Sequence, residues 1–129
     1  MESFLEVKFA LVGAPPRPDF LATEGNIVVT PNAPPLPTTG IGANGDLQRT
    51  FTIDFTQPRS DGTYQIDDLS TKMKLYEKTS FLDLTETNGT INIDAYNGKY
   101  SADFTGKMKD LAGREWDVVG KLYLEVVPQ

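Results

Sequence analysis

Hydrophobic and polar residues alternate along most of the chain. Leu5, Val7 and Phe9 occupy every second position near the start, and Phe51 and Ile53 do so farther along. A period of two is typical of β-strands with one buried face, and no apolar stripe of useful length has the period of a helix. The pattern predicts strands at about 3–12, 25–30, 48–57, 63–67, 71–77, 80–86, 90–97, 99–109 and 114–127.

These strands predict an all-β fold, either an antiparallel β-sandwich or a closed β-barrel of about 8–9 strands. Nothing along the sequence indicates a second domain, so residues 1–129 are expected to form a single domain.

The first third of the chain is rich in proline and glycine, with seven of the nine prolines between Pro15 and Pro37. We expect extended, solvated connections over 13–19 and 31–45, the second of them long enough to be either a binding loop or a mobile one. Pro34-Pro35-Leu36-Pro37 could act as a polyproline ligand, but loop rigidity is the favoured interpretation because PxxP patterns arise often by chance.

Two Asn-Gly pairs lie in the second half of the chain. Asn88-Gly89 and Asn97-Gly98 are the residues that a two-residue type I′ hairpin turn needs, because both turn positions require positive φ. The two turns predict registers that keep the same apolar face buried. The facing pairs are Ile91–Phe104, Ile93–Ala102, Ala95–Tyr100, Leu84–Ile93 and Leu82–Ala95.

The connection 110–114 fits a three-residue hairpin loop with Gly113 in a left-handed conformation. A four-residue loop would oppose Lys109 with Arg114, whereas the three-residue loop opposes unlike charges, so the charge pattern favours the shorter loop. The expected inward pairs are Met108–Trp116, Gly106–Val118, Phe104–Gly120 and Ala102–Leu122. The expected outward pairs are Lys109–Glu115, Lys107–Asp117, Asp103–Lys121 and Lys99–Glu125.

A tight link at Lys78-Thr79 would complete a five-stranded antiparallel meander over about 71–127, although both residues resist positive φ. It would pair Leu75 with Leu82, Met73 with Leu84 and Lys74 with Asp83. The doublets Asp67-Asp68 and Asp61-Gly62 indicate turns and match no calcium-binding loop.

The predicted register places Tyr76, Phe81 and Tyr96 in an outward row across neighbouring strands. Such a row could stack on a sugar or form the centre of a protein interface. Ordinary cross-strand aromatic pairing, which needs no ligand, is the simpler interpretation. These three residues are our candidates for binding a ligand or a partner.

The same register opposes Asp83 with Asp94. Facing carboxylates could hold a hard cation, but neighbouring lysines could compensate them equally well, and a flat sheet offers too few oxygens for a calcium site. We therefore favour ionic pairing and expect no metal centre. These carboxylates also lack the cleft that a glycosidase needs.

Small residues occupy the predicted inward positions Ala95, Ala102, Gly106 and Gly120 beside large aromatic residues. They could pack closely against the rings or leave a pocket for a small apolar molecule. Close packing is favoured because protein interiors are normally filled.

The amino-acid composition argues against several classes of function. The net charge of −6 argues against nucleic acid or an anionic membrane as partner. With neither histidine nor cysteine, the chain lacks the commonest catalytic and metal-binding side chains, so we lean away from an enzyme and expect no cofactor. No signal peptide or membrane-spanning run is evident, and we expect a soluble protein whose compartment the sequence does not indicate.

The leading hypothesis is a non-enzymatic β-sandwich module that acts through surface binding, either in protein assembly, including a homo-oligomer, or in carbohydrate contact. The alternative is a lipocalin-like β-barrel that carries a small apolar ligand. An enzyme of unknown class comes third.

Overall fold

A computed structural model describes residues 3–14, 17–30, 37–45, 48–77 and 79–126. Within them the chain forms ten strands and no helix. The strands are β1 (Phe4–Ala10), β2 (Phe20–Thr23), β3 (Ile27–Thr30), β4 (Thr38–Asn44), β5 (Arg49–Arg59), β6 (Gly62–Ile66), β7 (Thr71–Glu77), β8 (Ser80–Asp94), β9 (Lys99–Lys109) and β10 (Glu115–Glu125).

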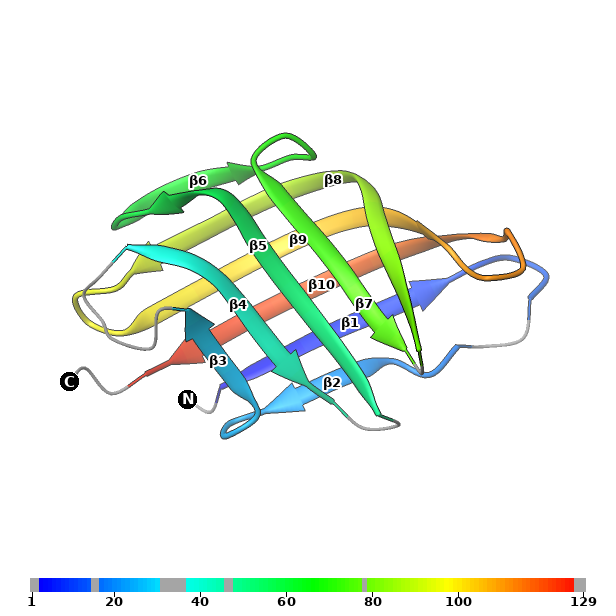
Figure 1. Cartoon of the computed structure of the whole chain (residues 1–129), viewed down its shortest axis with the longest axis horizontal. Helices are drawn as coiled ribbons and strands as arrows, with labels where there is room; N and C mark the ends of the chain where they lie inside the picture. Colours follow the sequence, from blue (N-terminus) through cyan, green and yellow to red (C-terminus); the bar gives the residue numbers. More distant parts are fainter. Residues whose placement is uncertain (1–2, 15–16, 31–36, 46–47, 78, 127–129) are drawn as a thin grey trace.

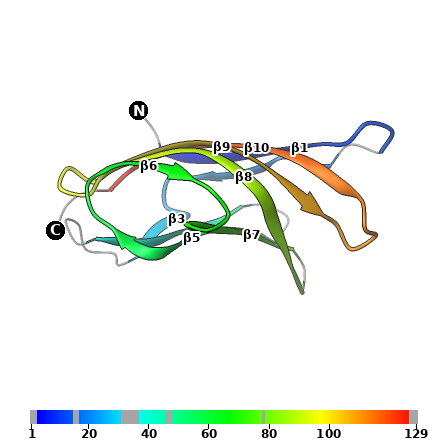
Figure 2. The same ribbon diagram turned by 90° about the horizontal axis from the view of Figure 1, so that it is seen from above.

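The strands form one antiparallel sheet that folds over on itself into two layers (Figures 1 and 2). The order is β2-β1-β10-β9-β8-β7-β5-β4-β3, with β6 added beside β8. The first layer contains β2, β1, β10, β9, β6 and most of β8, and the second contains β3, β4, β5, β7 and the start of β8. The predicted all-β sandwich or barrel is confirmed as a flattened, nearly closed barrel.

Strand β8 connects the two layers. Its first residues pair with β7, and its later residues pair with β9 and β6. Pairing with β9 begins at Leu84 and is interrupted by a β-bulge: the register shifts between Thr85 and Asn88, and Glu86 has a φ of 49°. Because the bulge adds one residue, the buried positions change from Leu82 and Leu84 to Ile91 and Ile93. Figure 2 shows β8 passing from one layer to the other.

The predicted turn at Asn88-Gly89 is wrong, because these residues lie inside β8. The predicted strands 80–86 and 90–97 are parts of one strand, so the meander over 71–127 has four strands in the described residues rather than five. Leu84 faces Met108 instead of Ile93. The bulge produces the change in buried positions that a turn was predicted to produce.

The register predicted from Asn97-Gly98 is wrong by two residues. Ile91 faces Ala102 and Ile93 faces Tyr100, because four residues, 95–98, connect β8 to β9. Side chains around this loop satisfy its backbone: the Asp61 carboxylate accepts a hydrogen bond from the Ala95 N–H at 2.7 Å. A shift of two residues preserves the buried face, so the interior agrees with the prediction although the partners do not.

Two predicted hairpins are confirmed. All eight predicted pairs between β9 and β10 occur, and Gly113 has a φ of 83° in the connecting loop. Between β7 and β8, Leu75 faces Leu82 and Lys74 faces Asp83 as predicted, but the pairing ends there, and Leu84 faces Met108 instead of the predicted Met73. Lys78, half of the connecting pair, lies outside the described residues.

The predicted loop over 31–45 is wrong in its second half, because residues 38–44 form β4, in which Ile41 and Ala43 are buried. Glycines at every second position hid this strand from a search for apolar alternation. The short strand β2 was also missed. The polyproline segment 34–37 lies outside the described residues except for Pro37.

Aromatic side chains fill the interior. The Phe51 ring stacks on Phe104 with centroids 5.9 Å apart, and Phe20 packs against Phe51 at the same distance. A Cβ at Gly120 would lie 2.0 Å from the Phe104 ring, and one at Gly106 would contact Leu84 and other neighbours. Gly106 and Gly120 therefore accommodate packed side chains, as the favoured interpretation predicted for them.

Candidate functional site

An aromatic pair, Tyr76 and Phe81, lies on the outer face of the β7–β8 hairpin. The two residues face each other across the strands, and their ring centroids are 4.7 Å apart. The Phe81 side chain is 62% exposed, whereas Tyr76 is partly covered. The sequence prediction of an outward pair at these positions is confirmed by this geometry.

A salt bridge lies one row farther along the same hairpin. Lys74 Nζ is 3.9 Å from a carboxylate oxygen of Asp83, and it also lies 5.6 Å from the centre of the Phe81 ring. The ammonium group is thus shared between a carboxylate and an aromatic face. Asp83 is partnered by a lysine, which confirms the predicted ionic pair.

A pocket of about 440 Å³ opens beside this salt bridge, where β7 and β8 separate. Pairing between the two strands extends from the hairpin only to Lys74 and Asp83, after which β8 turns toward β9. Figure 1 shows the strands diverging from their shared end. We name this pocket the β7–β8 groove. It is lined by Asp68, Thr71, Lys72, Met73, Lys74, Asp83, Leu84 and Thr85.

Asp68 connects the groove to the bulge in β8. Its carboxylate accepts hydrogen bonds from the backbone N–H groups of Glu86 and Thr87, both at 2.8 Å, and from the Thr87 hydroxyl at 2.6 Å. These bonds, led by that of the Thr87 hydroxyl, lower the pKa of Asp68 below its ordinary value. The carboxylate thus satisfies the Glu86 and Thr87 N–H groups, which lie beyond the point where β8 stops pairing with β7.

The turn that carries Asp68 is itself held by its neighbour. The Asp67 carboxylate accepts hydrogen bonds from the N–H groups of Leu69 and Ser70, at 3.0 and 2.8 Å. The predicted turn at Asp67-Asp68 is therefore confirmed. The Lys72 ammonium also donates to the Asp68 carbonyl oxygen at 2.6 Å, which further fixes the groove wall.

Tyr96 does not extend the aromatic pair. It lies in the loop after β8, whereas Phe81 is the second residue of that strand, and Figure 1 shows that the two ends of β8 lie far apart. Tyr96 is 71% exposed. The predicted three-residue row is wrong because it required a turn at residues 88–89.

Asp83 and Asp94 are also far apart along β8 and do not face each other. Asp94 faces Lys99 and accepts hydrogen bonds from the Asn97 side chain and backbone. The two carboxylates thus form no shared cation site. In the part of the chain that the structure describes, no group of three or more acidic side chains is placed to hold a metal ion.

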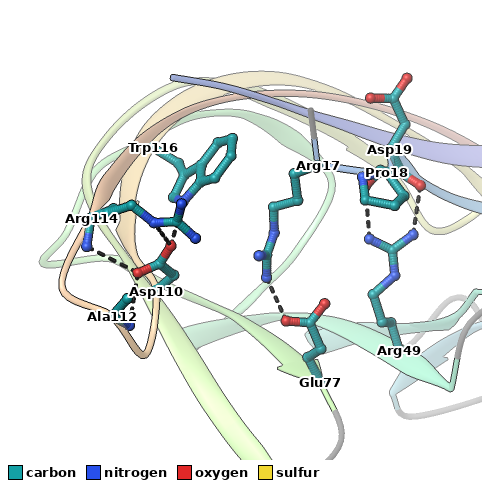
Figure 3. Close-up of polar contacts among 9 residues, drawn as sticks. All are labelled: Arg17, Pro18, Asp19, Arg49, Glu77, Asp110, Ala112, Arg114 and Trp116. Atoms are coloured by element: carbon teal, nitrogen blue, oxygen red, sulfur yellow. Dashed lines mark hydrogen bonds and ion pairs between the residues drawn. The ribbon is translucent and has the colours of Figure 1, made fainter. Parts of the chain in front are cut away.

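A second polar cluster closes one end of the sandwich, and we name it the arginine clasp: Arg17, Glu77, Asp110, Arg114 and Trp116 (Figure 3). Arg17 forms an ion pair with Glu77 between the two layers. The guanidinium groups of Arg17 and Arg114 lie 5.8 and 5.7 Å from the centre of the Trp116 ring. The Asp110 carboxylate accepts hydrogen bonds from the Trp116 indole at 2.9 Å and from Arg114 Nε at 2.8 Å.

These contacts, led by the Trp116 indole, lower the pKa of Asp110 to about 2. Arg49, which is 1% exposed, lies beside the clasp and donates to the carbonyl oxygens of Pro18 and Asp19 at 2.8 and 2.6 Å. The charged groups of this region are engaged with one another and with backbone carbonyls. We therefore interpret the clasp as a structural closure between the layers and not as a binding site.

Sequence reasoning found Tyr76, Phe81, Lys74 and Asp83 of the candidate site but missed the groove beside them. No local pattern marks where two paired strands diverge. The useful signal was that the buried apolar residues change from even-numbered positions at Leu84 to odd-numbered positions at Ile91. A bulge explains this change as well as a turn does.

Comparison with known proteins adds no relative: no family model matches the chain, and neither a curated protein nor a solved structure is significantly similar to it. Among the described residues, no helix is long and apolar enough to span a membrane.

Proposed function

We propose that this protein is a non-enzymatic binding module whose binding surface comprises the β7–β8 groove and the adjacent aromatic pair. The observation that carries the proposal is that the groove and the aromatic pair adjoin each other. Lys74 and Asp83 line the groove, and Lys74 also lies against the exposed Phe81 ring. Ligand sites combine apolar area with a few polar groups that fix the ligand's orientation; here the Phe81 ring supplies apolar area, and Lys74 and Asp83 supply polar groups.

The packed interior supports surface binding over the carrier alternative. A carrier of apolar molecules needs space among its inward side chains. Here the Phe104 ring occupies the space beside Gly120, and Leu84 and Thr87 lie against Gly106. Two of the four small inward positions that could have bordered a lumen are thus used for packing.

The chemistry of the groove supports binding over catalysis. A general acid needs a carboxyl group that can hold a proton at working pH. Asp68 accepts three hydrogen bonds and has a lowered pKa, so it stays ionised and engaged with β8. Asp83 is paired with Lys74.

The test uses two variants that each replace one exposed aromatic residue with serine. Phe81→Ser removes the ring from the proposed surface, and Tyr96→Ser removes a ring from the far end; the two residues are 62% and 71% exposed. Both proteins and the parent are examined by sedimentation velocity over a concentration series and by calorimetric titration with a panel of neutral oligosaccharides. We expect binding in at least one of these two assays, weakened in Phe81→Ser and unchanged in Tyr96→Ser.

Two results would contradict the proposal. One is the absence of both self-association and oligosaccharide binding by the parent. The other is binding that Phe81→Ser leaves unchanged.

A further inference from the structure

We infer that the ligand of this surface is an uncharged carbohydrate, with a sugar ring stacked on Phe81 and neighbouring hydroxyl groups bound in the β7–β8 groove. This inference rests on the proposed function and specifies its ligand. It follows from three features of the surface: the position of the exposed ring, the balance of charge in the groove and the small apolar area.

The first feature is the ring. Phe81 is held from one side by Tyr76, with centroids 4.7 Å apart, and its side chain remains mostly exposed. Packing against Tyr76 limits the positions available to the ring, so less conformational entropy is lost when a ligand covers it. The C–H face of a pyranose is apolar and matches such a platform.

The second feature is the balance of charge. The groove has two lysines, Lys72 and Lys74, and two aspartates, Asp68 and Asp83. An anionic ligand would approach both carboxylates, and a cationic ligand would approach both ammonium groups. Neither sign of charge is therefore favoured, which points to a neutral ligand.

The groups in the groove differ in their availability. Lys72 donates to the Asp68 carbonyl oxygen, and the Asp68 carboxylate is engaged with β8. The Lys74–Asp83 pair is longer, at 3.9 Å, and both side chains are substantially exposed. This pair offers a donor and an acceptor side by side, as a sugar with adjacent hydroxyl groups requires, since each hydroxyl can donate and accept.

The third feature is the small apolar area, which disfavours a second copy or another protein as the occupant. Stable protein interfaces bury about 800 Å² on each partner around a well-packed apolar centre. Around Phe81 and Tyr76 the adjoining outward positions are polar. Tyr76 faces Thr50, whose hydroxyl donates to the Asn44 side chain at 2.9 Å, and Lys74 faces Thr52.

The test is a calorimetric titration of the parent with neutral hexasaccharides of glucose, xylose and mannose. An anionic oligogalacturonate and a cationic glucosamine oligomer are titrated in parallel. We expect at least one neutral oligomer to bind, and neither charged oligomer to bind more tightly. Phe81→Ser should weaken binding of the neutral oligomer by about three- to tenfold.

Asp83→Asn tests the polar half of the site. It should weaken binding of the neutral oligomer by about three- to tenfold, because a charged acceptor is replaced. The matched control is Asp117→Asn, since Asp117 is an aspartate of similar exposure, 69% against 67%, in the outward Lys107–Asp117 salt bridge. The control should bind like the parent.

Failure of every neutral oligomer to bind would overturn the inference, as would tighter binding of a charged oligomer or equal loss in Asp117→Asn. These results are distinct from failure of the proposed function. Self-association that Phe81→Ser abolishes would preserve the binding surface and identify its occupant as a second copy.

Discussion

Phe104 on β9 lies directly opposite Gly120 on β10, and its ring fills the space that any larger residue at position 120 would need. A Cβ there would lie 2.0 Å from Phe104 Cζ. The ring cannot withdraw easily because it stacks on Phe51. The β9–β10 register therefore sets Phe104 opposite a glycine, and this leaves room for the ring to pack against Phe51 of the other layer.

Gly120→Ala should destabilise the fold by about 1–3 kcal/mol, because one added methyl group overpacks the core. Chemical denaturation of the variant and the parent measures this difference. Gly42→Ala is the matched control, since a Cβ at Gly42 on β4 would meet no atom within 4 Å. A loss for Gly120→Ala no larger than that of the control would refute the packing.

Removal of the Asp68 carboxylate should release the bulge in β8. Asp68→Ala leaves the Glu86 and Thr87 N–H groups without this acceptor, and we expect a loss of about 1–2 kcal/mol, because the site is partly solvated. Hydrogen exchange at the two amides should become faster. Asp94→Ala removes a carboxylate that accepts hydrogen bonds from Asn97 at the other end of β8, so unchanged exchange at Glu86 and Thr87 is expected there. Slow exchange in Asp68→Ala would contradict the role of this carboxylate.

Acid should weaken the arginine clasp through Asp110. Its pKa is lowered from 3.8 to about 2, so the stability gained from the ionised group is present above pH 3.8 and is lost as the pH falls toward about 2. The melting temperature of the parent should therefore fall more steeply between these values than that of Asp110→Asn. Equal slopes would show that Asp110 titrates normally in the folded protein.

Fluorescence gives an independent measure, because Trp116 is the single tryptophan of the chain and its indole donates to Asp110. Protonation of Asp110 should change the emission with a midpoint near pH 2 while the protein remains folded. Asp110→Asn should lack this transition.

Gly113 tests the loop between β9 and β10. Its φ of 83° is unfavourable for β-branched residues, whereas the position itself is open, with no atom within 4 Å of a Cβ. Gly113→Val should therefore cost about 1–3 kcal/mol through backbone strain alone. Gly113→Asn should cost less, because asparagine tolerates this conformation. Equal denaturation midpoints for both variants and the parent would contradict a strained backbone at this position.

The sequence predicted the β9–β10 hairpin fully because two independent signals agreed there. Gly113 indicated the loop type, and opposite charges such as Lys107 and Asp117 selected one register. In β8 a single signal was ambiguous. Asn88-Gly89 has the composition of a turn, but pairing with β6 and β9 on both sides keeps it extended. Tertiary pairing overrode local turn preference.

The candidate site, like the fold, was predicted from the sequence only in part. Tyr76 and Phe81 follow from a hairpin that connects adjacent strands, so local reasoning found them. Tyr96 was added through the incorrect turn. The groove depends on where β8 leaves β7, which is set by the bulge at Glu86 and by Asp68 from the preceding turn. Such a contact between separate segments has no signature in either segment alone.

The most direct test of the binding surface is a map of backbone amide chemical shifts, recorded by NMR during titration with the neutral hexasaccharides. We predict that the shifts that change group at residues 71–76 and 81–86, and that Phe81→Ser moves their midpoint to a higher ligand concentration while Tyr96→Ser leaves it unchanged. Chemical-shift changes centred on the loop at 95–98, on the arginine clasp or on strands away from Phe81 would contradict the account.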